Sequence, residues 1–117
     1  MRKYVKAKIH GLCVTRAALD YHGSIGVDGD LLQSAGIEPY ECVLVVNLTS
    51  GARWEAYAIP AGPGELHLNG GSARLGCVGD RCLLMTFAYE ERFSGARVLM
   101  IGPDNATCEV VRYEHQT

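Results

Sequence analysis

Residues 42–59 read CVLVVNLTSGARWEAYAI and carry the strongest secondary-structure signal in the chain. Its first part, residues 42–48, is an apolar and largely β-branched run with the length of a buried strand. The polar and glycine residues at 49–51 are typical of a hairpin turn. Residues 53–59 form a second strand signal, whose side chains point alternately to its two faces. The stretch therefore predicts a β-hairpin.

Strand signals also dominate the rest of the chain. They fall at residues 4–10, 12–15, 65–68, 82–89 and 97–101. Helical signals are limited to residues 15–20, 30–36 and 70–75. The second of these has Asp28 or Asp30 to cap its start and Gly36 to end it. Because many short strands with few helical turns are typical of small barrels, we expect a mainly β protein, a small closed β-barrel with a few short helices.

Length and composition bound the function. The chain has 117 residues, so we expect a single domain over residues 1–117. Hydrophobic residues make up 48% of it, which argues against a disordered chain. A net charge of −2 gives no reason to expect nucleic acid or an anionic membrane as a partner. A catalytic domain this small is expected to need a subunit interface to enclose its site.

Cysteine usage points to a reducing compartment. The five cysteines are scattered and include no Cys-x-x-Cys pair, and no apolar segment of an export signal follows the basic N-terminus. This pattern argues against a disulfide framework and against a zinc site. Charged residues also interrupt each apolar run well before the length of a membrane span. We therefore expect a cytoplasmic protein without a bound metal.

Gly23 and Ser24 are the most informative pair of residues. A glycine can hold a strained turn that leaves its carbonyl open, and the serine that follows can then attack that carbonyl. Arg53 and Tyr57 lie on one face of the same predicted strand and could line one cavity. Asn69 begins a turn rich in free backbone N–H groups. Taken singly, each of these residues has an ordinary structural explanation. Only their combination along the chain can therefore indicate a function.

In this order, the pieces resemble the pyruvoyl-dependent aspartate 1-decarboxylase family. The matching stretches are Lys8-Ile9-His10, Val14 to Ser24 with its Tyr21-His22-Gly23-Ser24 motif, Asp28-Gly29-Asp30-Leu31-Leu32, Ala35-Gly36-Ile37, Gly51-Ala52-Arg53, Tyr57-Ala58-Ile59, Asn69-Gly70 and Val78-Gly79-Asp80. The resemblance covers nearly the whole chain. It implies a six-stranded double-psi β-barrel that assembles as a homotetramer.

This family makes its own cofactor, and the resemblance implies the same here. Ser24 would attack the Gly23 carbonyl, and the chain would split into a β chain of residues 1–23 and an α chain of residues 24–117 that begins with a pyruvoyl group. That group would form an imine with the substrate amine and act as an electron sink, without pyridoxal phosphate or a metal. The implied reaction converts L-aspartate to β-alanine and carbon dioxide, for pantothenate synthesis.

The resemblance also assigns roles residue by residue. Lys8 and Arg53 match residues that bind substrate carboxylates, which suits a lysine point charge and the planar fork of an arginine. Tyr57 matches the proton donor to the product, and Ser24 is the pyruvoyl precursor. The other substrate-binding positions are Tyr21, Asn69, Gly70, Gly71 and Ser72.

The chain departs from the family pattern close to these positions. Ala56 stands where the family has a threonine whose hydroxyl assists the acyl shift. By analogy with an oxyanion-hole donor, losing such a hydrogen bond costs about 10²–10³ in rate. Gly71 and Ser72 replace part of an alanine-rich turn, and either Ser72 or Thr86 could supply the missing hydroxyl.

Two alternatives to aspartate decarboxylation stay open at this point. The same chemistry could act on another small or acidic amino acid, or the chain could be an unprocessed, non-catalytic double-psi barrel that serves as a binding module. Ala56 is the residue that favours the second alternative. The sequence also leaves open whether a maturation factor is a partner in the cleavage.

Overall fold

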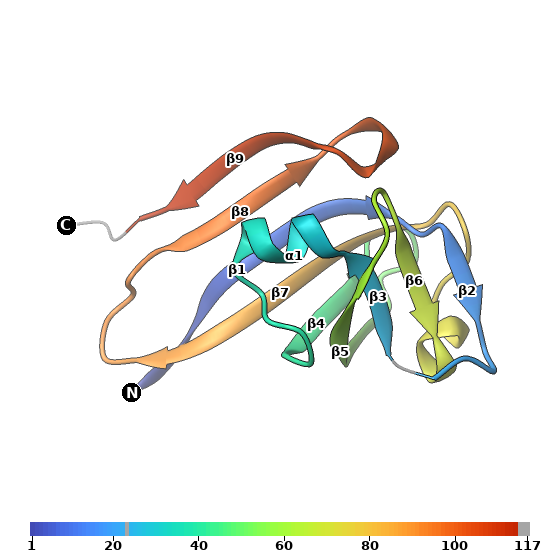
Figure 1. Cartoon of the computed structure of the whole chain (residues 1–117). Coiled ribbons are helices and arrows are strands. Elements are labelled where there is room, and N and C mark those ends of the chain that lie inside the picture. Colours follow the sequence, from blue (N-terminus) through green and yellow to red (C-terminus); the bar gives the residue numbers. More distant parts are fainter. Residues whose placement is uncertain (23, 115–117) are drawn as a thin grey trace.

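The computed structural model describes residues 1–22 and 24–114, and these residues form a mainly β protein, as predicted (Figure 1). The strands are β1 (Arg2–Cys13), β2 (Arg16–Ala18), β3 (Ile25–Asp28), β4 (Cys42–Asn47), β5 (Arg53–Ala61), β6 (Leu66–Asn69), β7 (Arg81–Glu90), β8 (Ala96–Ile101) and β9 (Thr107–Tyr113). The helical elements are α1 (Gly29–Ala35) and the 3₁₀ turns η1 (Gly70–Arg74) and η2 (Pro103–Asn105).

All of these strands belong to one mixed sheet, whose order is β2-β6-β3-β5-β4-β7-β1-β8-β9. The predicted hairpin is confirmed, since β4 and β5 pair antiparallel with Val46 opposite Arg53. Strand β3 lies between β5, to which it is parallel, and β6, to which it is antiparallel. The sheet curls around one hydrophobic core, which is consistent with the expected small barrel. Because β3 lies between β5 and β6, its first residue, Ile25, pairs with both of these strands.

The core follows from the alternation of side chains along the strands. On β5, Ala56 and Ala58 are buried while Arg53 and Tyr57 are exposed on the opposite face. The same rule gives the alternating burial of β4. The largest fully buried side chains come from five different strands and are Ile9, Leu12, Ile25, Leu66, Leu68, Leu84 and Leu99. The inward-facing side chains of these strands, together with Ala56 and Ala58 of β5, therefore form one hydrophobic core.

Helix α1 confirms the helical prediction for residues 30–36. The Asp28 side chain caps its start by accepting hydrogen bonds from the N–H groups of Asp30 and Leu31, at 2.9 and 3.3 Å. Gly36 ends it in the left-handed conformation, with φ of 77°. The helical prediction for 70–75 corresponds to the 3₁₀ turn η1.

The helical prediction for residues 15–20 is wrong, because residues Arg16–Ala18 form strand β2. Strand β2 pairs parallel with β6, so pairing with the sheet overrides a helical propensity that is weak over so short a segment. Thr15 fixes this pairing, since its N–H donates to the Leu66 carbonyl at 2.9 Å. Strand β2 ends at Ala18, and residues 19–22 then turn away from it.

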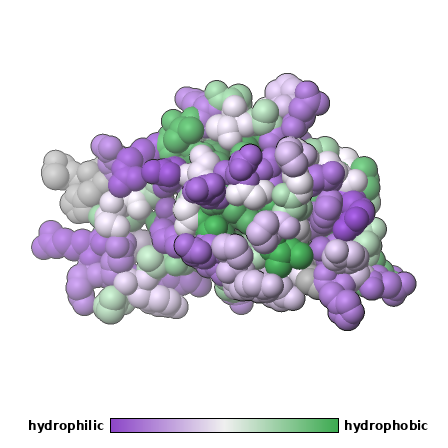
Figure 2. All heavy atoms as spheres, viewed as in Figure 1, coloured by the Kyte–Doolittle hydropathy of each residue, from purple (hydrophilic) through white to green (hydrophobic). Residues whose placement is uncertain are grey.

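Strand β8 pairs parallel with β1, and the β8–β9 hairpin forms one edge of the sheet (Figure 1). Figure 2 shows hydrophilic side chains over both ends of this face and hydrophobic atoms between them. The cysteines are free thiols, and Cys82 is the buried one. In the described part of the chain, no helix has the length and apolar character needed to cross a membrane.

Candidate active site

A depression of about 360 Å³ lies where the start of β3 meets β5, β6 and η1. Its lining residues are Ser24, Trp54, Glu55, Tyr57, Asn69, Gly71, Ser72 and Leu75. Five of these are residues for which the sequence predicted a role: Ser24, Tyr57, Asn69, Gly71 and Ser72. The fold therefore brings together, in one hollow, positions that are up to 48 residues apart in the chain.

The pairing of β3 explains why Ser24 lies beside Asn69 and Tyr57. Ile25, the residue after Ser24, pairs with Ala58 of β5 and with Leu68 of β6. The Asn69 N–H donates to the Ser24 carbonyl at 3.0 Å, which extends the β3–β6 pairing by one residue. Ser24 itself is half-buried. Its predicted partner in cleavage, Gly23, lies outside the residues that the structure describes.

Asn69 has a side chain that is buried without a protein partner. It is 1% exposed, and neither its Nδ2 nor its Oδ1 has a hydrogen-bond partner in the described structure. Burial of an unpaired amide is costly, so native proteins tolerate it mainly where the group has another use. The Asn69 amide therefore offers a donor and an acceptor beside the residue that would carry a carbonyl. An unpaired donor of this kind fits a pyruvoyl group at position 24.

Ser72 is held in the same depression by Trp54. The indole Nε1–H of Trp54 donates to the Ser72 hydroxyl oxygen at 2.9 Å, and Ser72 is 7% exposed. Because this bond uses the oxygen as an acceptor, the hydroxyl hydrogen of Ser72 is left to donate elsewhere. Gly70, the first residue of η1, takes a positive φ of 58°, which bends the chain so that Gly71 and Ser72 face the hollow.

The two hydroxyls proposed as substitutes for the family threonine have different positions. Ala56 pairs with Val43 of β4, and Thr86 lies on β7, on the far side of β4. Two strand spacings, about 10 Å, therefore separate Thr86 from Ala56. Thr86 is fully buried and its hydroxyl is unpaired, but it does not line the depression. Ser72 is the candidate that shares the hollow with Ser24.

Tyr57 also borders a second depression of about 500 Å³, together with Tyr21, His22 and Tyr40. Its ring stacks on that of Tyr40, with centroids 6.0 Å apart and an angle of 27° between the planes. Tyr21 is exposed and has the Arg16 guanidinium over its ring, 4.9 Å from the centroid. Tyr57 is therefore the residue that joins the two hollows.

Lys8 and Arg53 lie outside both depressions of the single chain. Lys8 is on β1, where its Nζ lies 3.2 Å from the Tyr113 hydroxyl. Strands β7 and β4 separate it from β5. Arg53 is exposed on the same face of β5 as Tyr57, as predicted, but one cavity does not hold both. Glu55, which sequence reasoning missed, is the one acidic or basic residue among the described residues that line the first depression.

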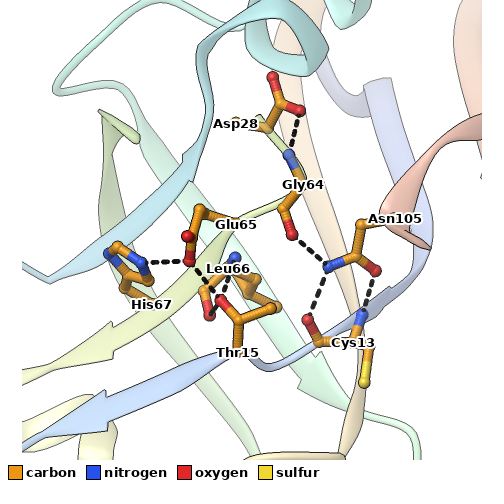
Figure 3. A network of polar contacts seen from close by, with 8 residues as sticks. All are labelled: Cys13, Thr15, Asp28, Gly64, Glu65, Leu66, His67 and Asn105. Carbon is orange, nitrogen blue, oxygen red and sulfur yellow. Dashed lines mark hydrogen bonds and ion pairs between the residues drawn. The ribbon is translucent and has the colours of Figure 1, made fainter. Parts of the chain in front are cut away.

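A second polar region lies at the opposite ends of β3 and β6 (Figure 3). There the Asn105 side chain bonds the N–H and carbonyl of Cys13 and the carbonyl of Gly64, all within 3.0 Å. Glu65 accepts from the Thr15 hydroxyl at 2.8 Å and contacts His67 Nε2 at 2.7 Å. The hydrogen bond from Thr15, and then that with His67, lower the pKa of the Glu65 carboxyl.

Comparison with known proteins decides the family. The family model described as aspartate decarboxylase matches residues 1–107. The chain belongs to the aspartate decarboxylase family. A protein of Desulfotalea psychrophila named aspartate 1-decarboxylase is 39% identical over 96% of this chain and 99% of its own length. Namesakes from Acaryochloris marina and Campylobacter jejuni subsp. doylei are 44% and 42% identical, over 92% and 94% of this chain and 87% and 91% of their own lengths.

Besides Glu55, sequence reasoning missed Trp54 and Tyr40 in this decarboxylase-family site, for different reasons. Trp54 lies on the face of β5 opposite Arg53 and packs against the core, and its contact with Ser72 depends on where the distant turn η1 lies. Tyr40 follows a Pro and precedes the strand, a position that carries no recognisable signal. Its positive φ of 70°, rather than its sequence context, distinguishes Tyr40 from its neighbours.

Proposed function

We propose that this chain converts L-aspartate to β-alanine and carbon dioxide. Membership of the aspartate decarboxylase family over residues 1–107 carries the proposal. The depression adds support, because it places Ser24 beside Tyr57 and beside the unpaired amide of Asn69. In the reaction one carboxyl group of aspartate leaves as carbon dioxide, and a proton takes its place at the same carbon.

The proposal includes a maturation step at the bond between Gly23 and Ser24. The Ser24 Oγ adds to the Gly23 carbonyl and the amide nitrogen leaves, which exchanges the amide for an ester. Elimination then releases residues 1–23 with a free carboxylate and leaves dehydroalanine at position 24. Water replaces the amine of that residue, ammonia is lost, and residues 24–117 begin with a pyruvoyl group. The half-buried position of Ser24 at the end of a strand supports its use as this nucleophile.

Asn69 and Ser72 are the residues we assign to this step. The Nδ2–H group of Asn69 has no partner among the described residues and can donate to negative charge that develops on the carbonyl oxygen under attack. The hydroxyl of Ser72, oriented by Trp54, can supply a second donor. In this chain Ser72 thus takes over the function of the hydroxyl that Ala56 lacks. Both side chains are nearly buried, which strengthens their hydrogen bonds.

During turnover the pyruvoyl carbonyl supplies the electron sink for the charge left on carbon when carbon dioxide departs. We assign the return of the proton to the Tyr57 hydroxyl, which lines the same depression. Asn69 and the backbone of Gly70 and Gly71 hold the reacting end of the substrate. Tyr21 flanks the entrance from the neighbouring hollow.

Substrate carboxylates require cations, and we assign Arg53 and Lys8 to them. Glu55 alone would repel a dicarboxylate, so a single chain has an incomplete site. Arg53 lies on the exposed face of β5, the same face as Tyr57, which lines the hollow. Lys8 is separated from β5 by two strands of its own chain. We therefore propose a cytoplasmic homotetramer in which Lys8 of one copy completes the site of another.

Two measurements test this function. Intact-protein mass spectrometry should show two fragments that meet between residues 23 and 24, and a panel of amino acids should give carbon dioxide release from aspartate above all others. A single full-length species after long incubation would contradict maturation and favour a non-catalytic barrel. Cleaved protein that releases carbon dioxide from a different amino acid would keep the chemistry and reject aspartate as substrate.

A further inference from the structure

Tyr40 has a backbone conformation that bulky residues rarely adopt. Its φ is 70°, and among the described residues it shares a positive φ with only two other non-glycine residues, Asp104 and Asn105. Asn105 has an evident reason, since its side chain clamps three backbone groups. Tyr40 has no such bonds from its side chain to described residues, and asparagine or glycine would be the residues favoured there. The strain at Tyr40 therefore calls for another explanation.

The turn before β4 holds Tyr40 in this conformation from both sides. The Tyr40 N–H donates to the Ala58 carbonyl at 2.7 Å, and the Ala58 N–H donates to the Glu41 carbonyl at 3.2 Å. The Glu41 carboxylate accepts from the N–H of Glu38 and from Lys6 Nζ, each at 2.9 Å. Strain persists where the surrounding structure fixes it in this way. The backbone of Tyr40 is thus attached to the residue next to Tyr57.

The ring of Tyr40 is not part of the hydrophobic core, because the side chain is 75% exposed. Its described aromatic contact is with Tyr57, on which it stacks at 6.0 Å. Tyr57 is itself 40% exposed on the open face of β5, and its hydroxyl makes no hydrogen bond to a described residue. Without Tyr40, little in the single chain would fix the Tyr57 side chain.

We propose that Tyr40 is a positioning residue that holds the Tyr57 ring for proton transfer beside Ser24. The inference rests on the proposed function, in which Tyr57 returns the proton to the product. Its physical basis is that stacked aromatic pairs have preferred geometries, so the Tyr40 ring restricts the rotation of Tyr57. A misplacement of about 1 Å at a reacting group can cost about 10²-fold in rate. The strained turn is therefore maintained for the sake of the neighbouring catalytic side chain.

Three variants separate a positioning role from a structural one. Tyr40→Asn removes the ring and places a residue that tolerates positive φ, whereas Tyr40→Phe keeps the ring. Tyr89→Asn is the matched control, because Tyr89 is 65% exposed on β7, away from both depressions. Each protein is taken as the matured assembly, and intact mass first shows that cleavage is complete.

We expect Tyr40→Asn to lower kcat for aspartate about 10- to 100-fold with KM changed less than threefold. Its unfolding temperature should stay within about 2 °C of the wild type or rise, since relief of strain offsets the lost ring contact. Tyr40→Phe and Tyr89→Asn should keep kcat within about twofold. The inference is overturned if Tyr40→Asn keeps kcat within twofold, if Tyr40→Phe loses as much activity, or if the loss of activity follows a loss of folded protein.

A spectroscopic measurement tests the same contact without turnover. In protein labelled with 3-fluorotyrosine, the ¹⁹F resonance of Tyr57 is the one that disappears in Tyr57→Phe. Tyr40→Asn should shift this resonance and Tyr89→Asn should not, because only Tyr40 stacks on Tyr57. An unshifted resonance rejects the inference. Absence of carbon dioxide release by the wild type rejects the proposed function instead, and the ¹⁹F shift still decides whether Tyr40 holds the Tyr57 ring.

Discussion

Strands β3 and β6 each run between two polar regions that differ in how their hydrogen bonds are satisfied. At one end, Asn105 uses both polar atoms of its side chain in bonds to backbone groups (Figure 3). At the other end, Asn69 is buried more completely, and neither polar atom of its side chain has a partner among residues 1–22 and 24–114. At one end of this pair of strands the buried asparagine amide is fully hydrogen-bonded, and at the other end it has no partner among the described residues.

This contrast separates a structural polar residue from a functional one. A buried amide that bonds several backbone groups contributes to stability, since each of those groups would otherwise be unpaired. A buried amide without partners lowers stability, so its retention indicates a use that the folded chain alone does not reveal. Substitutions at the Asn105 end should therefore affect folding, and substitutions at the Asn69 end should affect chemistry.

The largest expected effect separates two hydroxyl residues, one at each end. Ser24→Ala should abolish cleavage and decarboxylation, because the attacking oxygen and the pyruvoyl precursor are both lost. Thr15→Ala should still be cleaved, although it loses the bonds to Glu65 and to the backbone of Leu66. Intact mass after expression measures both. Fragments from Ser24→Ala would place the cleavage at another residue.

The two asparagines give the next largest contrast in chemistry. Asn69→Ala should slow cleavage by about 10²–10³, the usual cost of removing a donor to a developing oxyanion. Its free energy of unfolding should be unchanged or increased, since an unpaired buried amide is removed. The fraction of cleaved chain over time and denaturant unfolding of the precursor measure these effects. Wild-type cleavage by Asn69→Ala would show that the unpaired amide has no part in maturation.

Asn105→Ala should show the reverse behaviour. It leaves backbone groups of Cys13 and Gly64 without partners and places alanine at a φ of 55°. We expect a loss of about 2–4 kcal/mol in the free energy of unfolding, with cleavage of the folded fraction at the wild-type rate. A slowed cleavage in fully folded Asn105→Ala would mean that the two ends of the strands are coupled.

Sequence reasoning reached the family, the mainly β fold, the β4–β5 hairpin and the capped helix α1, because each has a local signal. It failed at β2, where pairing with β6 outweighs local propensity. It placed Arg53 and Tyr57 on one face of β5, as the structure does, but alternation gives the face of a strand and not what closes over it. The contacts of Trp54 with Ser72 and of Tyr40 with Tyr57 depend on how distant segments meet, so no local pattern predicts them.

A smaller effect is expected at Ser72. Ser72→Ala removes one hydrogen-bond donor from the depression, and Trp54→Phe removes the bond that orients it. Each should slow cleavage about two- to tenfold, less than the loss of Asn69, because Ser72 is the second donor and the Asn69 amide still donates to the developing charge. The double variant should be no slower than Ser72→Ala alone, because Trp54 acts through Ser72. Additive losses in the double variant would show that Trp54 acts on the site independently of Ser72.

The smallest effect concerns Glu65 at the structural end and appears only at low pH. The Thr15 hydroxyl and His67 lower the pKa of the folded carboxyl below its ordinary value. A carboxyl with a lowered folded pKa stabilises the protein fully above its unfolded pKa, and this contribution is lost as the pH falls through the folded pKa. The loss for Glu65 therefore begins below about pH 4.3, the ordinary value for glutamate.

Glu65→Gln has no charge to lose, so its unfolding temperature should fall less steeply than that of the wild type below about pH 4.3. Above that pH the two slopes should be parallel, and cleavage should be equal in both proteins because Glu65 lies away from Ser24. Thermal unfolding of the precursor across this range gives the comparison. Equal slopes at low pH would show that the contacts of Glu65 do not stabilise the folded protein. A change in cleavage would show that residues at the Glu65 end of β6 also influence the reaction at Ser24.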